Sequence, residues 1–182
     1  MSVVGKRVDR KDALDKVLGT AQYVDDIHFD NMLFAKGVYS RVAYGKIISI
    51  DINEAKNVKG VVKIITAKDI PGENLVPIVR KDMPYMAEGV VRYYGEPVAY
   101  VAAETQEAAE EGARLVKVEY EELPPVLSIE ESIKEDAPKI HPHGNIHKYY
   151  KIRKGDVETG FKEADIIIEN EYRTPHQEHS YL

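Results

Sequence analysis

Residues 90–123 read VVRYYGEPVAYVAAETQEAAEEGARLVKVEYEEL and decide the fold, because they hold a strand, a helix and a second strand in close succession. Val98 to Ala103 is a continuous apolar run, which is typical of a strand buried on both faces. Lys117 to Tyr120 alternates charged side chains with Val and Tyr, which predicts a return strand with one wet face. Pro124 and Pro125 end this strand, since proline has no amide hydrogen for a sheet.

Between these strands the sequence predicts a helix that ends near Val116. Thr105 offers an N-cap hydroxyl, and Glu107 puts negative charge at the positive end of the helix dipole. The stripe expected to face inward has little bulk and consists of Ala109, Gly112, Ala113 and Val116. Such a stripe lets a helix lie close to a sheet. We therefore predict a compact crossover, right-handed if its two strands are parallel.

The composition indicates a globular protein. The chain has 182 residues, 43% of them hydrophobic, which suffices to bury a core as one domain or one domain plus a tail. The net charge is −6 and the basic residues are scattered, which argues against nucleic acid or an anionic membrane as the main partner. No apolar run approaches the ~20 residues of a membrane span, and residues 1–15 are too charged for a signal peptide. We expect a soluble, cytoplasmic protein.

The rest of the chain alternates predicted strands and short helices. The expected strands are residues 32–41, 45–51, 61–66, 149–153 and 164–173. The expected helices are residues 53–57, 129–134 and 156–163, the last with Phe161 facing inward. Ser128 and Glu131 have capping-box spacing, and residues 73–87 are expected to form a long loop. Because strands outnumber helices, we predict an α+β domain with a mixed sheet, a β-α-β crossover and several short helices.

Two groups of histidines are candidate metal ligands. His141, His143 and His147 share one loop, and imidazole nitrogens bind transition metals. We favour a solvated, proline-stiffened turn instead, since no carboxylate or cysteine completes an obvious ligand set. His176 and His179 flank Glu178 and would share a face of a helix, but the preceding Pro175 argues against a complete metal site.

Other chemical signals are weak. Glu119, Glu121 and Glu122 form a carboxylate run, but alternation along a strand puts most of them in water, which disfavours acid–base catalysis. Asp25–Asp26 is more typical of a turn cap than of a cation site. The chain has no phosphate loop, no nucleophile elbow and no cysteine, so disulfides and cysteine-ligated zinc or iron–sulfur sites are excluded from it. The residues alone indicate a scaffold or docking domain without a complete active site.

Ten short segments along the chain, taken together, resemble one known protein family. The segments are 19–27 (GTAQYVDDI), 32–35 (MLFA), 39–41 (YSR), 47–51 (IISID), 60–62 (GVV), 66–71 (TAKDIP), 91–99 (VRYYGEPVA), 116–124 (VKVEYEELP), 155–157 (GDV) and 161–165 (FKEAD). In this order and spacing they resemble the N-terminal region of the molybdenum subunit of the xanthine dehydrogenase and aldehyde oxidase family. The resemblance implies an N-terminal arm at residues 1–15 and an α/β-hammerhead domain at 16–150. Residues 151–182 would then lead into the start of a molybdopterin-binding domain.

The resemblance also implies an activity for a complete enzyme. The family hydroxylates aldehydes or nitrogen heterocycles with oxygen from water, and it passes electrons from molybdenum to 2Fe-2S clusters and FAD. Related members oxidise carbon monoxide or reduce an aromatic thioester. The implied cofactors are therefore molybdopterin-molybdenum, 2Fe-2S and FAD in the complete enzyme. The implied partners are a molybdopterin-binding domain or subunit and the iron–sulfur and FAD subunits or domains, with no nucleic acid and no membrane span.

The tail Gln177–Leu182 (QEHSYL) resembles the Gln-Glu-His-x-Tyr-Leu segment with which the family's molybdenum domain begins. By that match Gln177 sits where the family places a glutamine beside an oxo ligand of the metal. Glu96 stands where many relatives have glutamine, a variant that we expect to be tolerated. The family's substrate-holding loops and catalytic glutamate have no counterpart here. We expect no catalytic residue, no metal ligand and no cofactor on the chain alone, which would be inactive by itself.

Two alternatives follow. The chain is either the leading part of a molybdenum hydroxylase, as a fragment or a separately encoded piece, or a non-catalytic hammerhead module for binding or assembly. The tail favours the first, because a free-standing module has no structural need for it.

Overall fold

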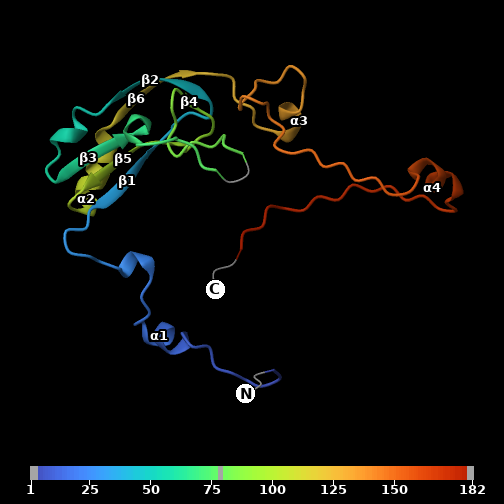
Figure 1. Cartoon of the computed structure of the whole chain (residues 1–182), viewed down its shortest axis with the longest axis horizontal. Coiled ribbons are helices and arrows are strands. Elements are labelled where there is room, and N and C mark those ends of the chain that lie inside the picture. Colours follow the sequence, from blue (N-terminus) through green and yellow to red (C-terminus); the bar gives the residue numbers. More distant parts are fainter. Residues whose placement is uncertain (1–3, 78–79, 180–182) are drawn as a thin grey trace. The chain divides into compact units, whose positions relative to one another are not determined.

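The computed structural model describes residues 4–77 and 80–179, which divide into two compact units between Asn145 and Ile146. The first unit contains α1 (Ala13–Leu18), η1 (Val24–Asp26), β1 (Phe34–Tyr39), β2 (Gly45–Asp51), η2 (Ala55–Asn57), β3 (Val61–Thr66), η3 (Ala67–Asp69), β4 (Val90–Val91), β5 (Pro97–Ala103), α2 (Gln106–Leu115), β6 (Lys117–Glu122) and α3 (Ile129–Ser132) (Figure 1). The second unit contains α4 (Val157–Glu163). None of the helices in the described ranges combines the length and the apolar character needed to cross a membrane.

The strands form two three-stranded sheets, with the orders β1-β5-β3 and β4-β2-β6. All their pairings are antiparallel, and α2 packs against β1 and β5 (Figure 1). The α+β class is thus confirmed. Strands β2 and β3 have the boundaries that the apolar patterns predicted, 45–51 and 61–66.

The central strand–helix–strand order is confirmed, but the two strands do not share a sheet. Both edges of β5 are hydrogen-bonded, one to β1 and the other to β3, so β5 has no edge left for β6. Strand β6 pairs with β2 in the second sheet instead. The expected mixed sheet with a crossover between parallel strands is therefore replaced by two antiparallel sheets that α2 connects.

Helix α2 forms as its sequence predicts. The Thr105 hydroxyl accepts a hydrogen bond from the Ala108 amide at 3.2 Å, and this caps the helix. Gly112 is buried, and a Cβ atom at this position would lie 2.9 Å from Cγ1 of Val101 and 3.0 Å from Cγ2 of Val61. The small stripe therefore lets the helix backbone approach β5 and β3 more closely than any larger residue would allow.

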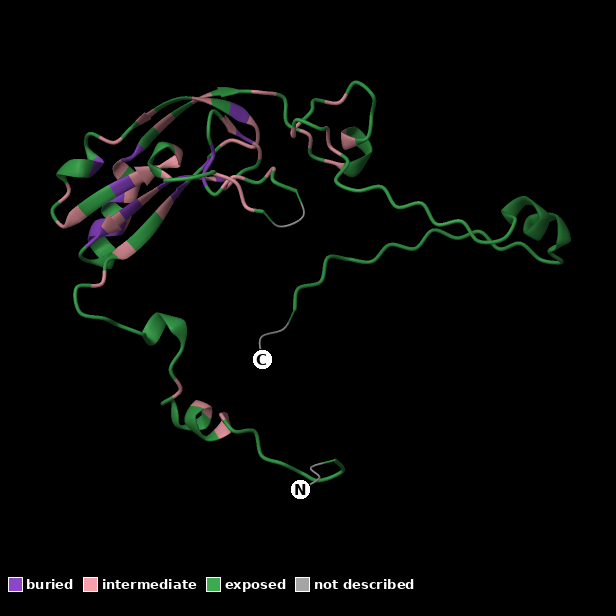
Figure 2. Ribbon diagram, viewed as in Figure 1, coloured by how far each residue is buried: buried purple, intermediate pink, exposed green. Residues whose placement is uncertain are grey.

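Strand β5 contributes to every part of the core. Buried residues lie mainly on β5 and α2 (Figure 2). The three buried clusters are Val38, Ala55, Ile64, Ala99, Val101 and Val116; Ala87, Val91 and Val98; and Ala103, Ala108 and Ala109. Val98 and Val101 are fully buried, and each such side chain contributes roughly 1.5–3 kcal/mol of transfer free energy.

The short helices follow their local signals. The helix expected at residues 53–57 is a single 3₁₀ turn, and Gly60 after it has a left-handed φ of +92°. The Ser128 hydroxyl accepts a hydrogen bond from the Glu131 amide at 3.1 Å, although α3 ends at Ser132 and not near residue 134. Helix α1 was not expected, and no residue in it is buried.

The second unit differs most from expectation. Helix α4 is confirmed, and Asp156 caps it by accepting a hydrogen bond from the Thr159 amide at 3.2 Å. The strands expected at 149–153 and 164–173 are wrong, since neither segment pairs with another strand within the described ranges. Phe161 is 57% exposed and not inward. Residues 146–179 are exposed throughout (Figure 2). Their apolar side chains are therefore not covered, and their backbone has no neighbouring strand in the described part of the chain to which it could hydrogen-bond.

Replacing Gly112 by leucine should destabilise the first unit by about 1–3 kcal/mol, because the new side chain has no space against Val101 and Val61. Thermal unfolding followed by circular dichroism measures the loss. Gly160→Leu in α4 is the matched control, since no atom lies within 4 Å of a Cβ there. An unchanged melting temperature for Gly112→Leu would show that the stripe does not limit the helix–sheet distance.

Candidate functional site

The structure brings two of the loop histidines together with a carboxylate. His143 Nε2 lies 3.1 Å from Oδ2 of Asp82, and His141 Nδ1 lies 3.9 Å from the same oxygen. The two imidazole rings stack with centroids 6.0 Å apart. His147 belongs to the second unit. Asp82 was missed because it lies far from the histidines in sequence and no local pattern marks it.

This cluster is not a metal site within the part of the chain that the structure describes. No group of three or more histidine, cysteine, aspartate or glutamate side chains there has the geometry to hold a metal ion. The Asp82 side chain is only 18% exposed, so its contact with His143 fastens the connection after α3 to the long loop before β4. The turn that was expected to be solvated is therefore held by contacts of His141 and His143 with Asp82.

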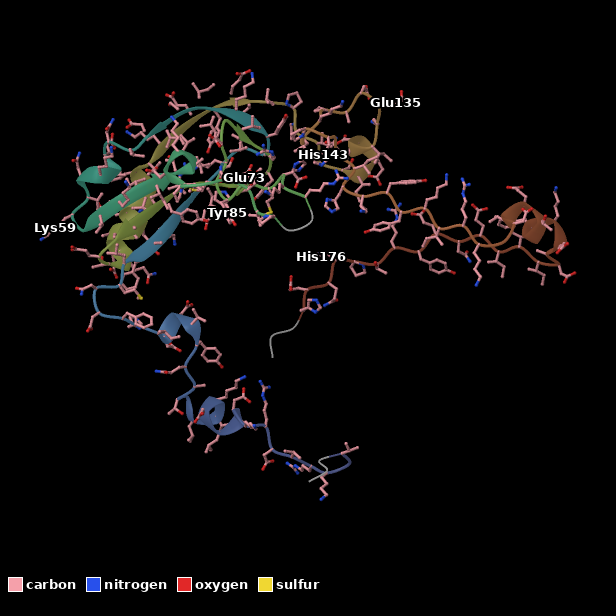
Figure 3. The ribbon with its side chains drawn as sticks, in the orientation of Figure 1. Lys59, Glu73, Tyr85, Glu135, His143 and His176 are labelled. Carbon is pink, nitrogen blue, oxygen red and sulfur yellow. The ribbon has the colours of Figure 1, made fainter. Side chains whose placement is uncertain are left out.

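The tail residues belong to the second unit and make only local contacts among its described residues. Residues 174–179 are exposed and form no helix, so His176 and His179 do not share a helical face. Figure 3 labels His176 in this segment. The Gln177 amide donates a hydrogen bond to the Glu178 carbonyl at 3.2 Å, and the His179 amide donates to the Glu178 carboxylate at 2.9 Å. These contacts are local, so the side chain of Gln177 is open to a further partner.

The other carboxylate groups have structural roles. The Ser49 hydroxyl donates to Glu119 at 2.8 Å, and the Lys46 ammonium lies 3.0 Å from Glu121, so both contacts join β2 to β6. Asp26 accepts a hydrogen bond from the Tyr23 amide at 2.9 Å, which is a turn cap. Glu119, Glu121 and Glu122 are exposed, as the alternation predicted.

Glu96 is a buried carboxylate that the sequence did not reveal as such. Its exposed fraction is 1%, and one oxygen accepts a hydrogen bond from the Arg92 backbone amide. The other oxygen lies 3.4 Å from Nη1 of Arg92. The backbone around it is tied to the end of β1, since the Ser40 amide donates to the Glu96 carbonyl at 2.8 Å and the Gly95 amide donates to the Ser40 carbonyl at 3.0 Å. Glu96 thus fixes the turn that leads into β5.

A groove of about 850 Å³ lies where β1, α2 and β6 meet, and the loop at residues 94–95 closes one side. Four of its lining side chains are cationic and one is anionic: Lys36, Arg41, Arg114, Lys117 and Glu110. The pKa of Glu110 is lowered, first by the Gln106 side-chain amide and then by Lys36, whose ammonium lies 3.1 Å away. Burial raises the pKa of Tyr120, which also lines the groove. Residues from β1, α2 and β6 line this groove, so it could not be predicted from any one segment of the sequence.

Two family models match the chain. Residues 18–124 match the a/b hammerhead domain of aldehyde oxidase and xanthine dehydrogenase, and residues 140–182 match the molybdopterin cofactor-binding domain. The first match covers most of the first unit, including both sheets and α2. The chain therefore belongs to the aldehyde oxidase and xanthine dehydrogenase family, and its hammerhead fold is confirmed.

Individual relatives agree with this assignment. The large molybdopterin subunit of nicotinate dehydrogenase from Eubacterium barkeri is 37% identical over 99% of this chain and 42% of its own length. Xanthine dehydrogenase/oxidase from Gallus gallus is 40% identical over 98% of this chain and 13% of its own length. The solved aldehyde oxidoreductase from Desulfovibrio gigas superposes with a TM-score of 0.78 at 31% identity, over 86% of this chain and 19% of the other. The chain thus spans less than half the length of these relatives.

Replacing Glu96 by leucine should cost about 3–5 kcal/mol of unfolding free energy, because Arg92 would lose its buried anionic partner. Replacing it by glutamine should cost only about 1–2 kcal/mol, since the amide oxygen still accepts the Arg92 amide hydrogen. Urea unfolding curves measure both losses. Equal losses for the two variants would contradict a role that depends on hydrogen-bond acceptance.

Proposed function

We propose that this chain is the structural and docking N-terminal part of the molybdenum subunit of a xanthine dehydrogenase-like hydroxylase. The observation that carries the proposal is the succession of two family models, hammerhead at 18–124 and molybdopterin-binding at 140–182, on a folded first unit. A free-standing hammerhead module would need only the first of these. The complete enzyme would insert oxygen from water into a C–H bond of an aldehyde or N-heterocycle, and would pass electrons to 2Fe-2S and FAD partners.

We propose three successive regions along the chain. Residues 1–15 are an arm, residues 16–150 the hammerhead domain, and residues 151–182 the start of the molybdopterin-binding domain. The second unit supports this division, because Ile166, Ile167 and Ile168 are 59–79% exposed in an unpaired extended segment. Apolar, unpaired backbone of this kind is typical of a strand that completes a sheet made by other residues.

The described residues fit a contribution to a molybdenum site but not a complete one. They include no metal-holding cluster, and Gln177 supplies a carboxamide whose donor and acceptor are both accessible. We therefore place Gln177 near the molybdenum only in the complete enzyme, where its amide would donate a hydrogen bond to an oxygen on the cofactor. The cofactor, when bound, supplies the redox chemistry of hydroxylation. We infer that such an enzyme works in the cytoplasm.

Hydrogen exchange tests whether the second unit completes another domain. In the isolated chain the amides of residues 164–173 should exchange without protection, because none is part of a strand pair. Mixing with the separately expressed remainder of the molybdenum subunit should protect them, whereas β5 should be protected in both samples. Unchanged exchange of residues 164–173 in an assembled complex would contradict the proposal, as would stoichiometric molybdenum retained by the chain alone.

The role of Gln177 is tested in the assembled enzyme. Gln177→Ala should lower kcat by about tenfold or more, since one correctly placed donor contributes a few kcal/mol to stabilising developing charge. Its molybdenum content should not change, because the metal is held elsewhere. Gln106→Ala, which removes an exposed amide from α2, is the matched control. If the Gln177→Ala and Gln106→Ala enzymes have equal activities, Gln177 is not part of the molybdenum site.

A further inference from the structure

Two edge strands line the groove between the sheets. Strand β1 is an edge of the sheet β1-β5-β3, and β6 is an edge of the sheet β4-β2-β6. Both strands line the groove, yet they pair neither with each other nor, within the described ranges, with any further strand. Unpaired edges present free amide and carbonyl groups to an incoming extended chain. An edge strand thus lies on each of two sides of the groove.

The side chains that line the groove are mainly cationic, which favours an acidic partner. Lys36 is paired with Glu110, and Lys117 is paired with Glu54, which lies outside the groove. Arg41 and Arg114 are exposed, and neither forms a salt bridge with a described residue. In a chain of net charge −6, this concentration of cationic side chains is a local exception. Guanidinium groups bind carboxylates through paired hydrogen bonds, so an acidic partner fits this surface.

Tyrosines provide the apolar part of the same surface. The Tyr39 ring lies over Gly37, where a Cβ atom would come within 2.5 Å of Tyr39 Cζ. Tyr39 is 50% exposed and Tyr94 is 72% exposed, and both line the groove. Half-exposed aromatic rings beside arginines are typical of surfaces that bind other polypeptides.

We propose that this groove binds an extended, acidic segment of a partner polypeptide, which adds a strand between β1 and β6 and places carboxylates on Arg41 and Arg114. Its backbone would occupy the open strand edges, and its apolar side chains would contact Tyr39 and Tyr94. The inference deepens the proposed function, since it rests on that function for the identity of the partner as another part of the hydroxylase. The groove itself is a property of this chain.

A synthetic decapeptide that alternates glutamate and valine tests the chemistry directly. Added to the ¹⁵N-labelled full chain, it should shift amide resonances mainly in β1 and β6, and the affinity should fall as salt rises. The matched probe alternates lysine and valine and should cause no such shifts. Equal shifts with both peptides, shifts confined to other elements, or no shifts at millimolar peptide would each overturn the proposal.

Charge reversals locate the site. Arg41→Glu and Arg114→Glu should each weaken peptide binding by about tenfold, whereas Lys59→Glu, an equal charge change at an exposed position outside the groove, should not (Figure 3). Equal weakening by Lys59→Glu would overturn the proposal. Tyr94→Ala provides a second test if an arginine variant fails to fold, because Tyr94 is exposed and its loss should weaken binding without unfolding the chain.

Assembly is then measured separately. Wild-type chain and the Arg114→Glu variant are each co-purified with the remainder of the molybdenum subunit and with the iron–sulfur and FAD partners. Weaker recovery of a partner with Arg114→Glu than with Lys59→Glu supports the groove as a docking surface. Full recovery of every partner with both variants overturns the groove proposal while leaving the proposed function intact. Absence of assembly even with the wild-type chain counts against the proposed function instead.

Discussion

Strand β5 satisfies hydrogen bonds along both of its edges and also enters all three buried clusters, and the rest of the first unit is arranged around this requirement. Val98 and Val101 belong to different buried clusters, so the strand contributes to the core on both of its faces. Helix α2 meets this strand through Gly112, whose lack of a side chain sets the distance between helix and sheet. A small residue is needed at Gly112, because the helix backbone itself packs against Val101 and Val61 and leaves no cavity there.

The position of β6 is a consequence of the same constraint. With β1 and β3 on either side of β5, β6 cannot lie beside β5, and it pairs with β2 in the other sheet. The result is two small sheets whose outer strands, β1 and β6, line one groove. The groove between β1 and β6 therefore follows from the hydrogen bonding of β5 with β1 and β3.

The chemical groups of the chain have mostly structural roles. Asp82 holds His143, Glu96 holds Arg92, and the β6 carboxylates pair with β2. Each of these contacts fastens a turn or a strand, and none forms a metal-holding cluster among the described residues. This fits a family in which the hammerhead domain accompanies a molybdopterin-binding domain.

Local signals in the sequence determined most of the elements of the first unit. The Thr105 and Ser128 caps, the apolar runs of β3 and β5 and the stripe through Gly112 all act within a few residues, so they could be predicted without the fold. The tail resemblance that singled out Gln177 is likewise a matter of sequence. Only the tertiary structure decided which strands share a sheet, that Asp82 meets His143, that Glu96 is buried, and that Arg41 and Arg114 line one groove. These features join residues distant in sequence, and strands 149–153 and 164–173 failed for the same reason: a strand exists only where another backbone supplies its hydrogen bonds.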